Sequence, residues 1–158
     1  LEDITKNITT LGQITKKEKE AELLKQEFAQ NLKKLSDKPL NKSAIYLYSS
    51  NPLMAFNDNS LIADILRLIG IKNLSPQSQI SRPVISAEYI LKQNPDILIL
   101  GMDVKNNLLD TNALLKNTKA VKTGSIYFNK DTPILLRLSP KIIDRIQEFK
   151  TKLENNNF

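Results

Sequence analysis

The apolar positions near the start of the chain repeat with a helical period. Over residues 14–35 they fall on one face of a helix and comprise Ala21, Leu24, Phe28, Leu32 and Leu35. Thr15 followed by Glu18 is a capping-box pattern that predicts where this helix begins, and Pro39 lies just beyond its end. A shorter helix is expected over residues 1–12, with a break at its final glycine.

The rest of the chain alternates between strand and helix patterns. Runs rich in β-forming residues predict strands at 44–49, 97–100 and 125–128, and a short one at 71–74. Helices are expected from Ser60 to Gly70, from Ser86 to Gln93, over 108–117 and after Ser139-Pro140. This alternation predicts an α/β fold, with a small parallel sheet, or a mixed one, flanked by helices and preceded by a long linker helix.

Four loops of this predicted sheet are candidates for a binding site. In open α/β sheets, ligands bind beyond the carboxyl ends of the strands. That rule selects the loops 49–59, 101–106 and 129–138, and the loop 75–83 if residues 71–74 form a strand.

Composition narrows the chemistry of the site. The chain has 158 residues, enough for one domain with a core of its own, and contains neither cysteine nor histidine. Disulfides, thiolate metal sites and a cysteine nucleophile are therefore excluded within this chain, as are histidine bases and histidine metal ligands. We expect binding rather than catalysis, and no cofactor.

Charge and hydropathy exclude other partners. The net charge is +6, but the lysines of the first 42 residues are mixed with glutamates, which favours a solvated helix surface over a nucleic-acid interface. No apolar run reaches the roughly 18 residues that a bilayer-spanning helix needs. Residues 1–15 lack the apolar core of a signal peptide, so we expect that any export signal has been removed.

Five short motifs, in this order, resemble one protein family. They are LGQIT at 11–15 before a charged helix, Asn51-Pro52 with LIGIKN at 68–73, ISAEYIL at 85–91 with NPDILI at 94–99, AVKTGSIY at 120–127, and LSPK at 138–141. Each motif alone is common, whereas their order and spacing together are specific. The chain resembles the C-terminal lobe and linker helix of the solute-binding proteins that serve ABC importers of ferric siderophores, haem and cobalamin.

The resemblance implies a fold, a function and a location. Residues 1–38 are expected to form the linker helix region and residues 39–158 the C-terminal α/β lobe of a bilobed binding protein. The family's ligand lies between two lobes, so this chain would supply one wall of the cleft. The implied function is to bind a metal chelate, foremost a ferric siderophore, and to deliver it to an ABC permease dimer. The implied location is periplasmic or extracytoplasmic, with membrane contact only through the permease or a lipid anchor.

The resemblance also assigns roles to charged residues. Glu88 stands where the family has an exposed glutamate that pairs with arginines of the permease, although a first-turn glutamate also complements the helix dipole. Arg82 and Arg137 lie in loops expected to face the cleft, where a guanidinium group suits anionic chelates. Either arginine would otherwise be paired with a neighbouring carboxylate on the surface.

The first loop supplies the remaining candidates for ligand contact, Asn51, Leu53, Met54 and Phe56. Apolar loop residues of this kind also often pack into a small core. For haem as the ligand, Met54, Met102 and Tyr48 are candidate axial ligands.

Alternatives to siderophore binding differ in class. Within transport, the alternatives are haem or cobalamin binding. Outside transport, the chain would be a structural or adhesive fragment without a small ligand, or an enzyme of the nitrogenase-like chelatase type. The chelatase reading requires metal-cluster ligands such as cysteine, which this sequence lacks.

Overall fold

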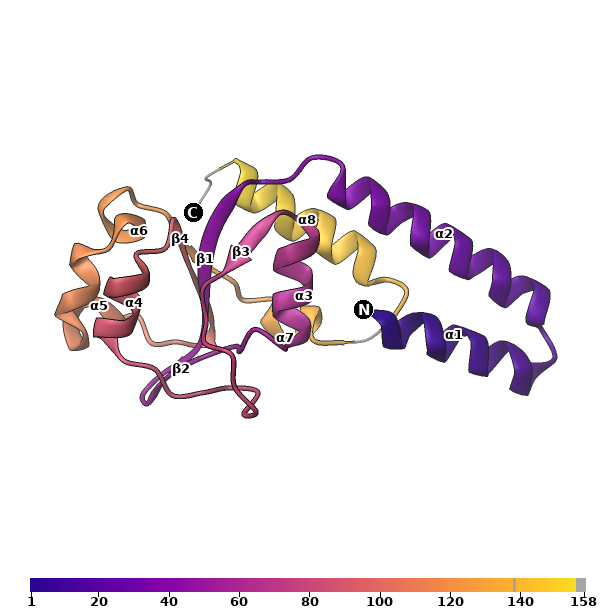
Figure 1. Ribbon diagram of the computed structural model, residues 1–158, viewed down its shortest axis with the longest axis horizontal. Coiled ribbons are helices and arrows are strands. Elements are labelled where there is room, and N and C mark those ends of the chain that lie inside the picture. Colours follow the sequence, from indigo (N-terminus) through magenta and orange to yellow (C-terminus); the bar gives the residue numbers. More distant parts are fainter. Residues whose placement is uncertain (138, 156–158) are drawn as a thin grey trace.

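The computed structural model describes residues 1–137 and 139–155, which form a helical hairpin joined to a sheet with helices on both faces (Figure 1). The strands are β1 (Lys42–Ser50), β2 (Leu53–Ala55), β3 (Ile71–Asn73), β4 (Ile97–Asp103) and β5 (Ile126–Phe128). The helices are α1 (Glu2–Thr15), α2 (Glu18–Ser36), α3 (Leu61–Leu68), α4 (Ala87–Gln93), α5 (Leu108–Thr111), the 3₁₀ helix η1 (Ala113–Asn117), α6 (Lys119–Lys122), α7 (Thr132–Leu135) and α8 (Ile142–Glu154). The α/β class predicted from the sequence is confirmed.

The sheet is mixed, one of the two forms predicted. β1 pairs in parallel with β4, and β4 pairs in parallel with β5. The other side of β1 is shared, because β3 pairs with its first residues in parallel and β2 folds back on its last residues antiparallel. The carboxyl ends of β1, β4 and β5 therefore meet at one edge, the lower edge in Figure 1.

Two apolar cores lie on opposite faces of the sheet, because alternate residues of a strand point to opposite sides. One core joins Ala44, Tyr46 and Ile99 of the sheet to side chains from α1, α2, α3 and α8. The other joins Ile45, Leu47 and Leu98 to α4, α5, η1 and α6. Figure 1 shows the two groups of helices on either side of the sheet.

Several helix ends fall where local signals predicted them. The hydroxyl of Ser60 accepts the backbone N–H of Ala63 at 3.2 Å, and that of Ser86 accepts the N–H of Tyr89 at 3.1 Å. Gly70 has a φ of 76°, and an added Cβ there would lie 2.3 Å from Cβ of Pro39. Glycine is therefore required at this turn both for its conformation and for its lack of a side chain.

The prediction for the first helices was wrong in its boundaries. Residues 14–35 are not one helix, because α1 continues to Thr15 and the chain turns at Lys16, which has a left-handed φ of 56°. Thr15 therefore does not cap α2, and its hydroxyl donates to a carbonyl of α1 at 2.7 Å. Gly12 does not break the helix. It is buried inside α1, where an added Cβ would lie 2.4 Å from Cβ of Ala21. The glycine lets the two helices approach closely.

Other boundaries moved where pairing or packing prevailed over local pattern. Strand β4 extends through residues 101–103, which were expected to be loop. The segment 108–117 divides into α5 and η1. Ser139 does not cap the last helix with its side chain, since the N-cap position of α8 is Lys141. Leu138, the end of the predicted loop 129–138, lies outside the described residues.

Helix α2 is fixed to the sheet domain through α8. Phe28 and Leu35 of α2 are buried in the same core as Ile146 and Phe149 of α8. Lys150 is only 4% exposed, and its ammonium group donates to the backbone carbonyl of Leu35 at 2.8 Å. This bond satisfies one of the last carbonyls of α2, which have no partner within the helix.

Candidate functional site

Arg82 lies on an aromatic platform at the carboxyl edge of the sheet. Its guanidinium carbon is 3.9 Å from the ring centroid of Tyr48, on β1, and 5.8 Å from that of Phe56, directly after β2. The two rings meet edge to face, with centroids 5.7 Å apart. Phe56 is buried, while Arg82 and Tyr48 are half-buried. The stack holds the cation by its face, in a cation–π geometry.

The charge of Arg82 has no carboxylate partner within residues 1–137 and 139–155. Its face is covered by Tyr48, whereas the N–H groups of a guanidinium point outward in the plane of the group. A planar set of N–H donors matches a carboxylate, catecholate or phosphate oxygen pair. The arrangement is therefore suited to binding an anionic group.

The loop that carries Arg82 runs beside β2 as an irregular extra strand. The backbone N–H groups of Ala55 and Asn57 each donate, at 3.1 Å, to carbonyls of Pro83 and Ser81 respectively. Met54 and Val84 form an antiparallel bridge one step further along. These bonds place Arg82 next to the end of β1.

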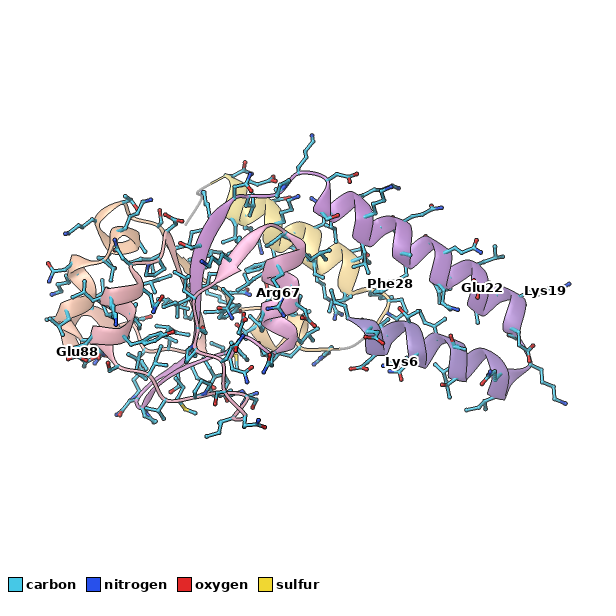
Figure 2. All side chains as sticks on the ribbon, in the orientation of Figure 1. Lys6, Lys19, Glu22, Phe28, Arg67 and Glu88 are labelled. Carbon is cyan, nitrogen blue, oxygen red and sulfur yellow. The ribbon has the colours of Figure 1, made fainter. Side chains whose placement is uncertain are left out.

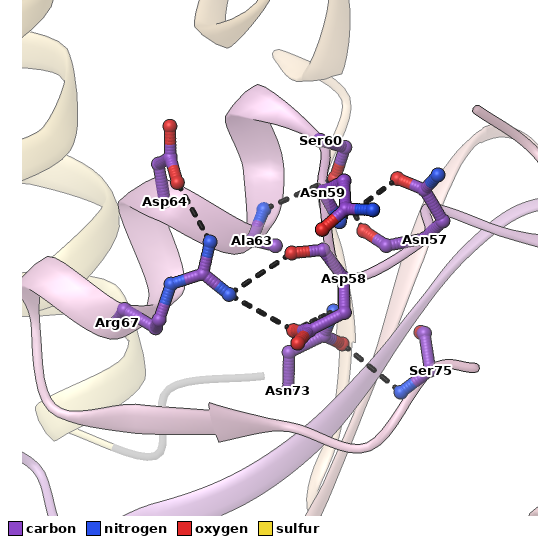
Figure 3. Close-up of polar contacts among 9 residues, drawn as sticks. All are labelled: Asn57, Asp58, Asn59, Ser60, Ala63, Asp64, Arg67, Asn73 and Ser75. Atoms are coloured by element: carbon purple, nitrogen blue, oxygen red, sulfur yellow. Dashed lines mark hydrogen bonds and ion pairs between the residues drawn. The ribbon is translucent and has the colours of Figure 1, made fainter. Parts of the chain in front are cut away.

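A polar network supports the turn between β2 and α3 (Figure 3). Arg67 of α3 donates to the backbone carbonyl and to the carboxylate of Asp58, both at 3.0 Å, and to Asp64 at 2.7 Å. Asn73, at the end of β3, also donates to the carboxylate of Asp58, at 3.3 Å. The turn is thereby tied to both α3 and β3.

A second, buried network lies beneath the aromatic platform. The ring of Tyr46 contacts Phe56 with a centroid distance of 5.2 Å. Its hydroxyl lies 2.7 Å from the Thr132 hydroxyl and accepts an N–H of Asn129 at 2.8 Å. Burial raises the pKa of the Tyr46 phenol well above its ordinary value. This network joins β1 to Asn129 and to the start of α7, a helix that lies within the segment 129–138 where a loop was predicted.

The structure brings some of the predicted ligand residues together and separates others. Phe56 and Arg82 share the platform, and Met54 is bridged to the residue two positions after Arg82. Leu53 packs in the core on the opposite face of the sheet and is 8% exposed. Asn51 is exposed in the turn between β1 and β2.

Two further candidates lie at the end of β4 and beyond α7. Arg137 is exposed, two residues after α7, and its side chain forms no recorded ion pair within the described ranges. Met102 is 56% exposed at the end of β4. Within the described residues, neither side chain forms a hydrogen bond, ion pair or cation–π contact with Tyr48, Phe56 or Arg82.

Glu88 is exposed in the first turn of α4, on the side of the molecule opposite the α1–α2 hairpin (Figure 2). Hydrogen bonds from its own backbone N–H and from the hydroxyl of Ser86 hold the pKa of its carboxyl below the usual range. The helix N-terminus stabilises the same charge. Glu88 therefore presents a negative charge to the solvent, from a helix that packs on the face of the sheet opposite Tyr48 and Phe56.

Sequence reasoning missed two supporting residues of the site. Asn57 and Tyr46 were not singled out, because a single asparagine in a loop or a tyrosine in a strand carries no specific signal. The cluster Asn57-Asp58-Asn59-Ser60 is the one local hint, because such residues are typical of turns and helix caps.

In residues 1–137 and 139–155, no three acidic, histidine or cysteine side chains are grouped so that they would hold a metal ion. Nor does any helix of those residues combine the length and apolar character that crossing a bilayer requires.

Comparison with known proteins identifies the family of the chain. Residues 1–133 match the family model described as periplasmic binding protein. A vitamin B12-binding protein of Pectobacterium atrosepticum is 22% identical over 161 aligned positions, which cover 95% of this chain and 57% of that protein.

Solved structures share the fold. A possible iron-binding, periplasmic solute-binding protein of Staphylococcus epidermidis superposes with a TM-score of 0.83 at 22% identity, covering 96% of this chain and 62% of that one. A protein of S. aureus solved with haem gives a TM-score of 0.76 at 18% identity, with 93% and 62% covered. This chain thus spans about 60% of the length of these relatives. The match to the family model shows that the chain belongs to the periplasmic binding protein family.

Proposed function

We propose that this chain is the C-terminal lobe of the substrate-binding component of an ABC importer, and that it contributes Arg82 to a site for an anionic metal chelate, foremost a ferric siderophore. The observation that carries the proposal is the half-buried guanidinium of Arg82, stacked on Tyr48 and without a carboxylate partner among the described residues. Taking a charge partly out of water is costly unless an opposite charge meets it. A bound anion would supply that charge.

The chemistry of the ligand follows from the same geometry. Ferric siderophores hold iron through oxyanions such as catecholate, hydroxamate or carboxylate, and a guanidinium group binds these oxygens with charge-assisted hydrogen bonds. Haem propionates and the phosphate of cobalamin offer similar oxygens, so both remain alternative ligands. The relatives support the same range, since their names refer to iron, haem and vitamin B12.

The division into two parts is also a proposal. We assign residues 1–38 to the link with a second lobe and residues 39–158 to the ligand-facing lobe. Four large apolar side chains of the α1–α2 hairpin are exposed, namely Leu11, Ile14, Leu23 and Leu24. An apolar cavity of about 520 Å³ lies between α1, α2 and the residues Ser139 and Pro140. Exposed apolar surface of this kind is typical of interfaces, which supports packing of a second lobe here.

Docking to the permease is assigned to Glu88. Its side chain is exposed, carries a stabilised charge and stands on α4, which packs on the face of the sheet opposite Tyr48 and Phe56, and this suits a contact that leaves the ligand site open. The partner would be a permease dimer with a basic surface. An extracytoplasmic location, with or without a lipid anchor, follows from the same assignment.

The test is a titration of this chain with diamagnetic gallium(III) chelates, which stand in for the ferric forms in NMR. The panel contains a catecholate, a hydroxamate and a citrate complex, with cyanocobalamin and haemin as separate arms. We expect shifts in the backbone signals of residues around Arg82 and weak binding, because only one wall of the cleft is present.

Charge reversal identifies the binding group. Arg82→Glu is expected to weaken the preferred chelate more than about tenfold, the effect of losing one charge-assisted contact and adding repulsion. Lys72→Glu makes the same change in net charge on an exposed residue of β3, at the amino end of β1, and should bind as the unaltered chain does. Arg137→Glu tests the second arginine in the same way. If no member of the panel binds, or if Arg82→Glu binds normally, the proposal is refuted, and the absence of any ligand would favour a structural or adhesive role.

A further inference from the structure

Asn57 is a buried polar side chain whose hydrogen bonds all lead to backbone atoms near the arginine site. It is 4% exposed. Its amide nitrogen donates to the carbonyls of Ser78 at 2.8 Å and Ile80 at 2.9 Å. Its amide oxygen accepts the backbone N–H of Asn59 at 3.2 Å (Figure 3). Both N–H donors of the side chain are therefore used on the loop that leads to Arg82.

The backbone of Asn57 is itself held in place. Its carbonyl accepts the hydroxyl of Ser60 at 2.7 Å and the backbone N–H of Ser60 at 3.3 Å. Arg67 donates hydrogen bonds to the backbone carbonyl and to the carboxylate of the next residue, Asp58. Asn57 thus projects from a turn that α3 fixes, and its side chain reaches from that fixed turn to the neighbouring loop.

The loop 75–83 has few other supports. At its start, the N–H of Ser75 donates to Asn73 at 3.2 Å, and at its end the carbonyls of Pro83 and Ser81 accept the backbone N–H groups of Ala55, in β2, and of Asn57. Between these points, the recorded hydrogen bonds that join residues 76–80 to the rest of the described chain both come from Asn57. Without them, residues 76–80 would keep only their own local bonds, while Ser81, directly before Arg82, would stay bound to the backbone N–H of Asn57.

We propose that Asn57 is a positioning residue, which fixes residues 78 and 80 and thereby holds the guanidinium of Arg82 on the ring of Tyr48, ready for an anionic ligand. This inference rests on the function proposed above and adds a residue that does not touch the ligand. A site held in its bound geometry before the ligand arrives loses less entropy on binding, so the affinity is higher. Asn57 acts on affinity only through Arg82.

The first experiment needs no ligand. Protons of the Arg82 side chain, above the ring of Tyr48, should show an upfield ring-current shift in NMR spectra. We expect Asn57→Ala to abolish most of this shift. Asn57→Asp, which keeps the oxygen that accepts from Asn59 but has no N–H donors when ionised, should do the same and guards against a failure of the alanine variant to fold. Asn59→Ala is the matched control, because the Asn59 side chain is exposed and has no recorded hydrogen bond within the described residues. An unchanged shift in both Asn57 variants overturns the inference.

The second experiment is a double-mutant cycle, with the gallium(III) chelate that the titration above selects. Asn57→Ala should weaken binding about three- to tenfold when Arg82 is present and less than about twofold when Arg82 is replaced by alanine. Suppose that Arg82→Ala weakens binding as expected. If Asn57→Ala then reduces affinity equally with and without Arg82, or in neither case, the positioning role is overturned. Unaltered binding by Arg82→Ala overturns the proposed function itself, and the inference with it.

Discussion

Replacing Tyr46 by phenylalanine removes one buried hydroxyl and leaves the aromatic packing intact. The direction of the hydrogen bonds around it follows from the donors available. The hydroxyl of Thr132 donates to the carbonyl of Asn129 at 2.8 Å, so its oxygen must accept from Tyr46. Tyr46 in turn accepts from the amide of Asn129. The chain of bonds therefore runs from Asn129 through Tyr46 to Thr132 and back to Asn129.

The expected loss of stability follows from which groups lose a hydrogen-bond partner. In Tyr46→Phe, one N–H of the Asn129 amide, in a residue only 2% exposed, loses its acceptor, and one lone pair of Thr132 loses its donor. A net hydrogen bond contributes about 1 kcal/mol, and a buried donor left unsatisfied costs about 1–3 kcal/mol. The greater hydrophobicity of phenylalanine offsets part of this. We expect a loss of about 2 kcal/mol in the free energy of unfolding.

The assay is urea unfolding followed by far-UV circular dichroism, with the dependence on urea concentration compared between variants. Tyr48→Phe is the control, because the hydroxyl of Tyr48 has no recorded hydrogen bond in the described ranges, and it should change stability by less than about 0.5 kcal/mol. A Tyr46→Phe variant as stable as the control would refute the network as drawn.

Alkaline pH tests the same hydroxyl in another way. Because the phenol of Tyr46 has a raised pKa in the folded chain, it keeps its proton at a pH where the unfolded chain has lost it. The contribution of the Tyr46 phenol to stability is fully present below about pH 10, the ordinary pKa of tyrosine, and declines as the pH rises above that value. Stability should therefore fall less steeply above pH 10 in Tyr46→Phe than in the unaltered chain, and equal slopes would contradict the raised pKa.

Three further predictions concern other parts of the chain. The Lys119 ammonium is the main cause that lowers the pKa of Asp96 from 3.8 to about 2. The Asp96 carboxylate therefore contributes to stability above about pH 4, and this contribution is lost as the pH falls towards 2. Asp96→Asn should lower the free energy of unfolding by about 1 kcal/mol at pH 7, after allowance for solvent screening. On acidification, the urea midpoint of this variant should fall less than that of the unaltered chain. An equal fall would count against the ion pair of Asp96 and Lys119. The effects of Gly12→Ala and Ala21→Gly on the free energy of unfolding should be coupled by about 1–3 kcal/mol, because the second change makes room for the first. Thermal or urea unfolding measures this coupling. Strictly additive effects would show that the two helices can separate without cost. Glu88→Gln should leave chelate affinity unchanged and reduce uptake in cells that carry the rest of the importer, and normal uptake would remove the docking role.

Local signals predicted the elements whose ends depend on one residue and its immediate neighbours. Ser60 and Ser86 cap their helices because the partner N–H lies three residues away, and Gly70 ends α3 because its own conformation requires glycine. In these three cases the determining interaction lies within a few residues. The alternation of strand and helix patterns also predicted the sheet, although its pairing joins residues far apart in the chain, such as Ala44 and Ile97.

Long-range contacts decided the features that were missed. Gly12 has the local appearance of a break, yet it stays helical because Ala21 packs against it. Lys16 adopts a left-handed conformation, although it is neither glycine nor asparagine, the residues that usually indicate one. Arg82 was selected for its charge, but its contact with Tyr48 joins residues 34 positions apart and depends on how two loops pair. Sequence patterns carry little information about such distances, because only the assembled sheet creates them.

The buried Lys150 has a mechanical consequence. Its bond to the carbonyl of Leu35, together with the burial of Phe28, means that α2 cannot swing relative to the sheet without breaking a buried hydrogen bond of a charged group, which would keep only the carboxylate of Glu154, 4.0 Å away. The helix and the sheet therefore move as one stiff body. A force applied at the tip of the hairpin, about 19 residues of helix from the sheet, is transmitted to the carboxyl edge as a rotation of the whole lobe rather than absorbed as bending of the joint.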